Sequence, residues 1–135
     1  MKSFVLDASA AIHYLQAGPG AGKFERLLAN ARRQQLQLFM SVLNLGEVYY
    51  LTWQRTGEEK ARQAVASLSH LPIQIIPVDL LQSLKAGELK AMHKIPYVDS
   101  VAAALAFQRD ATLVTSDRDF EKLGRHFPIL WIARP

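Results

Sequence analysis

Four acidic side chains stand where buried strands and helices are expected to end or begin. Asp7 closes the apolar run SFVLD, and Asp117 closes the run ATLVTSD. Glu47 lies on a mostly apolar helix stripe, and Asp99 stands in IPYVDSVAAALA (residues 95–106), where its own helix face carries only alanines. Even a neutral polar group costs roughly 2–7 kcal/mol when it is buried without a partner. These carboxylates therefore need a compensating group, and Asp99 needs one most.

If these carboxylates converge, they form a site for a hard cation. Two like charges about 4 Å apart cost about 4 kcal/mol at an effective dielectric constant of about 20, so protons or a cation must neutralise them. Oxygen ligands without histidine or cysteine nearby suit Mg²⁺ or Mn²⁺. The chain has no cysteine. Its histidines show no metal-ligand spacing, and we interpret all four as structural or surface residues: His13, His70, His93 and His126.

Each acid also has a simpler interpretation. Asp7 could cap the following helix, Asp99 could be an N-cap, and Asp117 could be a turn residue. Glu47 could neutralise a buried arginine. No single position decides between these interpretations, but the joint placement of four acids in a chain with only 12 favours a common site.

Apolar runs alternate with helical periodicity along the chain. We expect strands at residues 3–7, 36–41, 73–78, 111–117 and 128–133, and helices at 8–16, 23–35, 42–56, 58–71, 80–94 and 120–127, with a further helix after Pro96 that carries Asp99. This alternation indicates an α/β fold, a three-layer α/β/α sandwich around a central parallel sheet of about five strands. The carboxyl ends of such strands line a crevice, where Asp7 and Asp117 would lie close together if their strands are neighbours.

Length, composition and charge limit the remaining choices. The 135 residues are expected to form one domain over 1–135, with 50% hydrophobic and 21% charged residues. The net charge of +4 favours a polyanionic partner such as nucleic acid. No stretch resembles a signal peptide or a membrane span, and the lack of cysteine fits a reducing compartment. We therefore expect a soluble cytoplasmic protein.

Two further stretches suggest functional motifs, but each has a simpler structural interpretation. GPGAGKF (residues 18–24) lacks the first glycine and the Ser or Thr of a phosphate-binding loop and follows a helix, so we interpret it as a flexible loop. The aromatic stretch YYLTW (residues 49–53), with Phe39, could stack on bases. Its helical spacing instead favours a place in the core or in a dimer interface.

Four segments resemble, in order and spacing, the motifs of the PIN-domain ribonucleases, in particular the compact VapC-type toxins of toxin–antitoxin pairs. The segments are FVLDASAAI, SVLNLGEVYY, YVDSVAAALA and LVTSDRDFEKL, and the resemblance covers residues 4–132. It implies one acidic site whose members are both catalytic residues and ligands of Mg²⁺ or Mn²⁺: Asp7, Glu47, Asp99 and Asp117. It also implies supporting roles for Asp119, Ser9, Thr115 and Asn44.

The same resemblance implies an activity and partners. The activity is endonucleolytic hydrolysis of RNA phosphodiester bonds, with one or two metal ions polarising the phosphate and acidifying a bound water. Arginines and lysines would contact the RNA backbone. By analogy with the family we expect a VapB-type antitoxin as inhibitor, a homodimer and no association with membranes.

Two alternatives from other functional classes stay open. A receiver-type phospho-acceptor domain also carries aspartates at strand ends, although SFVLD supplies one acid where a pair is expected. A catalytically inactive PIN-like module would bind RNA or protein without cleaving, and the presence of all four acids argues against it. RNA cleavage with Mg²⁺ or Mn²⁺, with and without EDTA, distinguishes the three.

Overall fold

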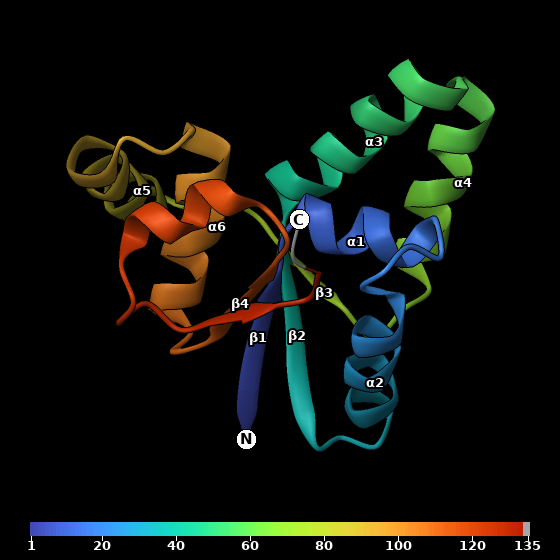
Figure 1. Cartoon of the computed structure of the whole chain (residues 1–135), viewed down its shortest axis with the longest axis horizontal. Helices are drawn as coiled ribbons and strands as arrows, with labels where there is room; N and C mark the ends of the chain where they lie inside the picture. The colour runs from blue at the N-terminus through green and yellow to red at the C-terminus, as the bar shows by residue number, and fades with distance from the viewer. Residues whose placement is uncertain (134–135) are drawn as a thin grey trace.

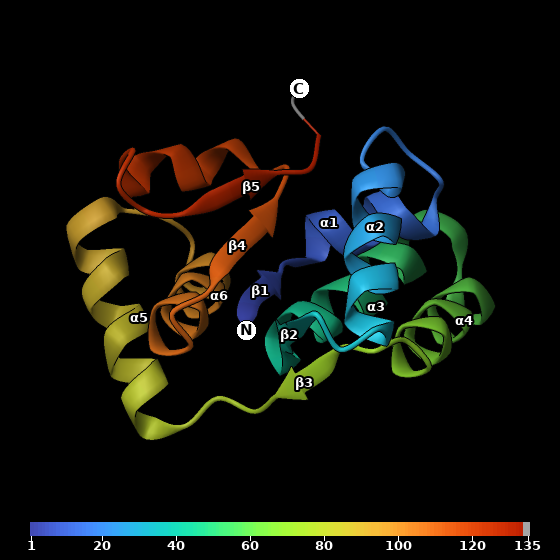
Figure 2. The same cartoon turned by 90° about the horizontal axis from the view of Figure 1, so that it is seen from below.

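The computed structural model describes residues 1–133, which form a five-stranded sheet between two layers of helices (Figures 1 and 2). All four strand pairings are parallel, and the strand order is β3-β2-β1-β4-β5. The strands are β1 (Lys2–Leu6), β2 (Leu36–Ser41), β3 (Gln74–Ile76), β4 (Thr112–Thr115) and β5 (Ile129–Trp131). The predicted α/β fold with a parallel sheet of about five strands is confirmed.

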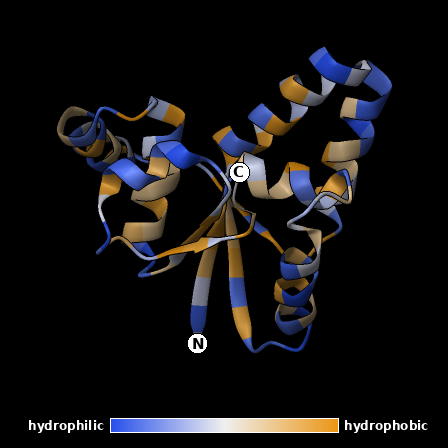
Figure 3. Cartoon of the chain, viewed as in Figure 1, coloured by the Kyte–Doolittle hydropathy of each residue, from blue (hydrophilic) through white to orange (hydrophobic). Residues whose placement is uncertain are grey.

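Helices cover both faces of this sheet. They are α1 (Ala8–Leu15), α2 (Ala21–Arg32), α3 (Val42–Thr56), α4 (Glu58–Ser69), α5 (Leu80–His93) and α6 (Tyr97–Gln108), with a 3₁₀ helix η1 (Arg118–Leu123). Alternate strand residues point to opposite faces. Val5 packs into a core with α5, α6 and η1, whereas Leu6 packs into a second core with α1, α2 and α4. Figure 3 shows this pattern as hydrophobic strand centres and hydrophilic outer turns of α3 and α4.

Helix α6 is buried on all sides over most of its length. Every residue from Asp99 to Ala106 is buried, as expected for a helix that is apolar around its whole circumference. The small alanines let α6 lie close to the sheet and to α5. Because Asp99 is the third residue of this helix, its carboxylate starts inside the protein rather than on its surface.

Several element boundaries differ from the sequence prediction. The helix expected at 120–127 is a 3₁₀ helix that begins at Arg118, because the side chain of Asp117 caps it, and ends before Gly124, whose φ of +87° suits glycine. Strand β3 ends before Pro77, which cannot donate to a ladder. None of the helices in residues 1–133 has the length and apolarity needed to cross a bilayer.

Candidate functional site

The strand order reverses between β1 and β4, and this is where ligands bind in open α/β sheets. Asp7 directly follows β1, and Asp117 lies two residues beyond β4. Both line a cleft of about 340 Å³, which Asp99 of α6 and Glu47 of α3 also line. The fold thus brings the four sequence-predicted acids to one cleft from four different elements.

Asp7 is held rigidly in the wall of this cleft. It caps α1, with the amide of Ala10 donating to Oδ1 at 2.9 Å, as the simpler interpretation expects. The hydroxyl of Ser9 also donates to Oδ1 at 2.7 Å, and the hydroxyl of Thr115 donates to Oδ2 at 2.5 Å. The predicted supporting residues Ser9 and Thr115 therefore both contact Asp7.

The same two hydroxyls also bind the backbone amides of Ser116 and Asp117. The Thr115 hydroxyl accepts from the amide of Asp117 at 2.9 Å, and the Ser9 hydroxyl accepts from the amide of Ser116 at 3.0 Å. Burial raises the pKa of Asp7 to about 6, although the three hydrogen bonds favour its ionised form. The net result is a carboxylate that ionises near neutral pH in a fixed orientation.

Asp99 has no comparable support. It is only 8% exposed, and none of the residues in 1–133 donates a hydrogen bond to its side chain. Burial and the charges of Asp117, Glu47, Asp7 and Asp119 raise its pKa to about 7. The interpretation of Asp99 as an N-cap is wrong, because Pro96 occupies that position and no side chain caps the helix.

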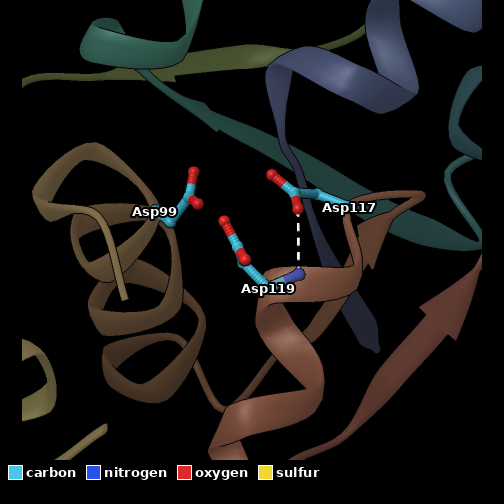
Figure 4. Close-up of side chains that lie close together, drawn as sticks. All are labelled: Asp99, Asp117 and Asp119. Carbon is cyan, nitrogen blue, oxygen red and sulfur yellow. Dashed lines mark hydrogen bonds between the residues drawn. The ribbon is translucent and has the colours of Figure 1, made fainter. Parts of the chain in front are cut away.

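Asp119 lies with Asp99 and Asp117 in the most compact group of acids (Figure 4). One carboxylate oxygen from each of the three lies within 4.8 Å of the others. Asp117 Oδ1 accepts from the amide of Asp119 at 2.9 Å, which places both side chains at the start of η1, opposite Asp99. The sequence assigned Asp119 only a supporting role. Three oxygen donors at this spacing, with no nitrogen or sulfur donor among them, fit a hard divalent cation.

Glu47 enters the cleft from α3 and is half-buried. Its Oε1 accepts from Asn44 Nδ2 at 2.7 Å, so Asn44 is in contact with it, as predicted. Burial and the charge of Asp117 raise the pKa of Glu47, and the hydrogen bond from Asn44 opposes this shift. No arginine among the described residues pairs with Glu47, so the buried-arginine interpretation is wrong.

Sequence reasoning missed three other residues of the cleft. His13 and Gln16 line it from α1, and Arg55 lines it from the last turn of α3. The helical spacing Glu47–Leu51–Arg55 places Arg55 on the same face as Glu47, and this signal was present in the sequence. Only the meeting of α1 with α3 shows that His13 faces the same space.

The strand order excludes one alternative function. Receiver-type domains have the doubly wound order 2-1-3-4-5, whereas this sheet has the order 3-2-1-4-5. The chain is therefore not a receiver domain.

Comparisons with known proteins agree with this geometry. The family model of the PIN domain matches residues 4–126. A search of curated proteins found no match. A chain of DNA-bound VapBC from Salmonella typhimurium is 19% identical with a TM-score of 0.78, over 98% of this chain and 100% of that one.

Two further solved structures share the fold. VapBC2 from Rickettsia felis, bound to a DNA fragment from its promoter, contains a chain that is 18% identical with a TM-score of 0.77, over 95% of this chain and 97% of that one. The sarcin–ricin-loop-cleaving toxin VapC20 of Mycobacterium tuberculosis is 22% identical with a TM-score of 0.74, over 98% and 99% of the two chains. Because the family match spans most of its length, this chain belongs to the PIN domain family.

Proposed function

We propose that this protein is an endoribonuclease that depends on Mg²⁺ or Mn²⁺. The observation that carries the proposal is the environment of Asp99, a buried carboxylate that receives no hydrogen bond from residues 1–133 and faces four other acids. A protein gains nothing in stability from such an arrangement, because each like charge adds repulsion. A divalent cation removes this cost.

The compact group of acids would hold the cation, with Asp99, Asp117 and Asp119 as ligands. Asp7 lies outside that compact group but lines the same cleft, and we keep its predicted role as a further ligand. A bound divalent ion supplies Lewis-acid polarisation of the phosphate and acidification of nearby water.

Glu47 is suited to accept a proton. Asn44 donates to its Oε1, no residue in 1–133 donates to its Oε2, and Glu47 lines the cleft. Burial raises its pKa, and a carboxylate with a raised pKa is the stronger base. We assign Glu47 Oε2 as the group that orients the attacking water and takes its proton.

RNA is the proposed substrate for two reasons. The pI near 9.6 favours a polyanion, and one structure with this fold is of a toxin that cleaves the sarcin–ricin loop. An open cleft at the carboxyl ends of the central strands suits a single-stranded loop better than a duplex, whose bases are stacked inside.

The test is cleavage of a labelled single-stranded RNA by purified protein. We expect cleavage with Mg²⁺ or Mn²⁺, none with EDTA, and loss of at least two orders of magnitude in rate for Asp117→Asn. Asp110→Asn, which changes an exposed acid outside the cleft, serves as the matched control. An inactive PIN-like module would bind the RNA with unchanged affinity in EDTA and never cleave it, which would refute the proposal.

We also propose that an antitoxin protein inhibits this chain. Several solved structures with this fold are toxin–antitoxin complexes, including one from Klebsiella pneumoniae. A groove of about 280 Å³ between α1, α3 and α4 shares Ile12 and Gln16 with the acidic cleft, so a chain bound there would cover its entrance. Expression of the protein alone should slow growth, and Asp99→Asn should abolish this effect; equal toxicity of that variant would count against the toxin role.

Helix α5 supports the proposed homodimer. Leu80, Leu81 and Leu84 are 73%, 70% and 63% exposed, and Phe107 of α6 is exposed beside them under the ammonium group of Lys85. Contiguous exposed apolar side chains mark association surfaces. Light scattering should show a dimer for the wild type and a monomer for Leu84→Glu; a monomeric wild type would refute this expectation.

A further inference from the structure

The acidic cleft has a second, basic end. Glu47, Leu51 and Arg55 line it along one face of α3, and the helix axis rises about 12 Å over the eight positions from the glutamate to the arginine. Helix α1 also lines the cleft, with His13 six positions after the N-cap Asp7. Both helices start at the edge of the sheet and run outwards (Figure 1). The acids therefore lie at the inner end of the cleft, and the basic side chains lie towards its mouth.

The guanidinium group of Arg55 has no partner among the described residues. It is exposed and makes no ion pair or hydrogen bond with any residue in 1–133. Its neighbour Glu58 pairs instead with Arg62. Arg55 lies in the last turn of α3, where a cation interacts favourably with the helix dipole. This interaction is the competing explanation for an arginine at position 55. That explanation does not require Arg55 to face the cleft.

His13 is held in the cleft wall by a close approach of the glycine-rich loop. The amide of Gly18 donates to the carbonyl of His13 at 2.7 Å, and a Cβ at position 18 would lie 2.9 Å from His13 Nδ1. Any side chain at position 18 would therefore displace the imidazole. Gly20 is equally close to Ile132. Close packing, rather than flexibility, explains both glycines, and for Gly18 the packing partner is a residue of the cleft.

We propose that Arg55 and His13 form a phosphate-binding subsite that holds the RNA strand at a second position beside the acidic end. The proposal rests on the proposed nuclease function. An acid-lined cleft repels a polyanion, so a substrate that reaches the acids needs positive charge nearby. The guanidinium group suits phosphate oxygens because it offers paired donors, and the imidazole N–H adds another.

The distance indicates which phosphate is held. Successive nucleotides of one stacked strand are about 3.4 Å apart. The rise of about 12 Å along α3 therefore spans roughly three or four stacked nucleotides, and fewer when the strand is extended. The subsite therefore binds a phosphate a few nucleotides from the bond that is cleaved. This contact fixes the register of the strand and carries no base specificity.

Steady-state cleavage of a fluorogenic single-stranded RNA at several KCl concentrations tests the subsite. We expect Arg55→Gln to raise KM about two- to fivefold, in the range of one partly exposed ion pair, with kcat unchanged, because the contact is the same before and during the reaction. The slope of log(kcat/KM) against log[KCl] should become less steep by about 0.7, the value for one phosphate contact on a single strand.

Arg33→Gln is the matched control. Arg33 is an exposed arginine at the end of α2, and its replacement by glutamine removes one positive charge, as Arg55→Gln does. It should leave KM and the salt slope close to the wild-type values. His13→Asn should raise KM without changing kcat.

A neutral methylphosphonate placed in turn at each linkage of the RNA locates the contact. At one linkage away from the cleaved bond, the methylphosphonate should raise the KM of the wild type and leave the KM of Arg55→Gln unchanged. If Arg55→Gln behaves as Arg33→Gln does, or only lowers the melting temperature, the subsite is wrong and the helix dipole explains Arg55. If the wild type cleaves no RNA, the proposed function fails, and the subsite fails with it.

Discussion

Asp99→Asn should make the metal-free protein more stable while removing its ability to bind a cation. In the folded chain the pKa of Asp99 is raised from 3.8 to about 7, chiefly by burial and then by the charge of Asp117. One pKa unit corresponds to 1.36 kcal/mol, so the ionised carboxylate costs the fold up to about 4 kcal/mol above pH 7. An asparagine of nearly the same shape avoids most of this cost.

The sign follows from proton binding. Between pH 3.8 and about 7 the folded state holds a proton on Asp99 that the unfolded state has released, so the free energy of unfolding falls as the pH rises. The advantage of Asp99→Asn is therefore small near pH 4 and largest above pH 7. At pH 8 in EDTA we expect a gain of about 2–4 kcal/mol, or about 6–15 °C in Tm.

Thermal melts followed by circular dichroism at pH 4.5, 6 and 8 measure this effect. With Mg²⁺ at about 100 times its Kd, the wild type should gain about 2.7 kcal/mol, and Asp99→Asn should gain little. Asp110→Asn, an exposed acid outside the cleft, should change stability by only a few tenths of a kcal/mol. The reasoning is refuted if Asp99→Asn is no more stable than the wild type at pH 8, or if it keeps the full response to Mg²⁺.

Three further predictions concern the same cleft. Cleavage should decrease as the pH falls through about 7 and then about 6, because Asp99 and Asp7 become protonated, and more Mg²⁺ should shift this decrease to lower pH in initial-rate measurements. Thr115→Val should cost about 1–3 kcal/mol in urea unfolding, because Asp7 loses a donor in the buried wall. Gly18→Ala should raise KM for RNA as His13→Asn does, because the added methyl group displaces the imidazole.

Matched variants separate these effects from general damage. Thr112→Val changes a half-buried threonine on the same strand and should cost less in urea than Thr115→Val. Gly87→Ala adds a methyl group to open space on α5 and should leave KM unchanged. A Thr115→Val variant as stable as Thr112→Val would show that the Asp7 hydrogen bond adds nothing to stability. A wild-type KM for Gly18→Ala would show that the position of His13 does not affect RNA binding.

The sequence predicted the fold well because most strands are nearly continuous apolar runs that alternate with segments of helical periodicity. Asp7 and Asp117 follow such runs, and a parallel sheet places both at the same edge. What the sequence did not determine is which strands are neighbours. Pairing of β1 with β4 decides that these two acids meet, and it depends on the packing of the whole sheet.

The close approach of Asp119 to Asp99 and Asp117 was missed for a local reason. The predicted helix began at residue 120, which left Asp119 in a loop. In the structure the helix begins at Arg118, because the side chain of Asp117 turns back to accept from the amide of Asp119. This cap shifts the first turn by two residues and brings the carboxylate of Asp119 close to Asp99. Propensity alone does not predict such a side-chain cap.

Asp7 and Asp99 are the two most buried acids of the cleft, and their hydrogen-bond environments are opposite. Asp7 receives three hydrogen bonds from the chain, which favour its charged form and hold it in one orientation. Asp99 receives none from the described residues and instead faces four negative charges. A purely structural carboxylate would resemble Asp7. Once Asp99 is ionised, none of the described residues offers it a hydrogen bond, which fits the proposed cation. This asymmetry makes the metal response of Asp99→Asn the decisive measurement.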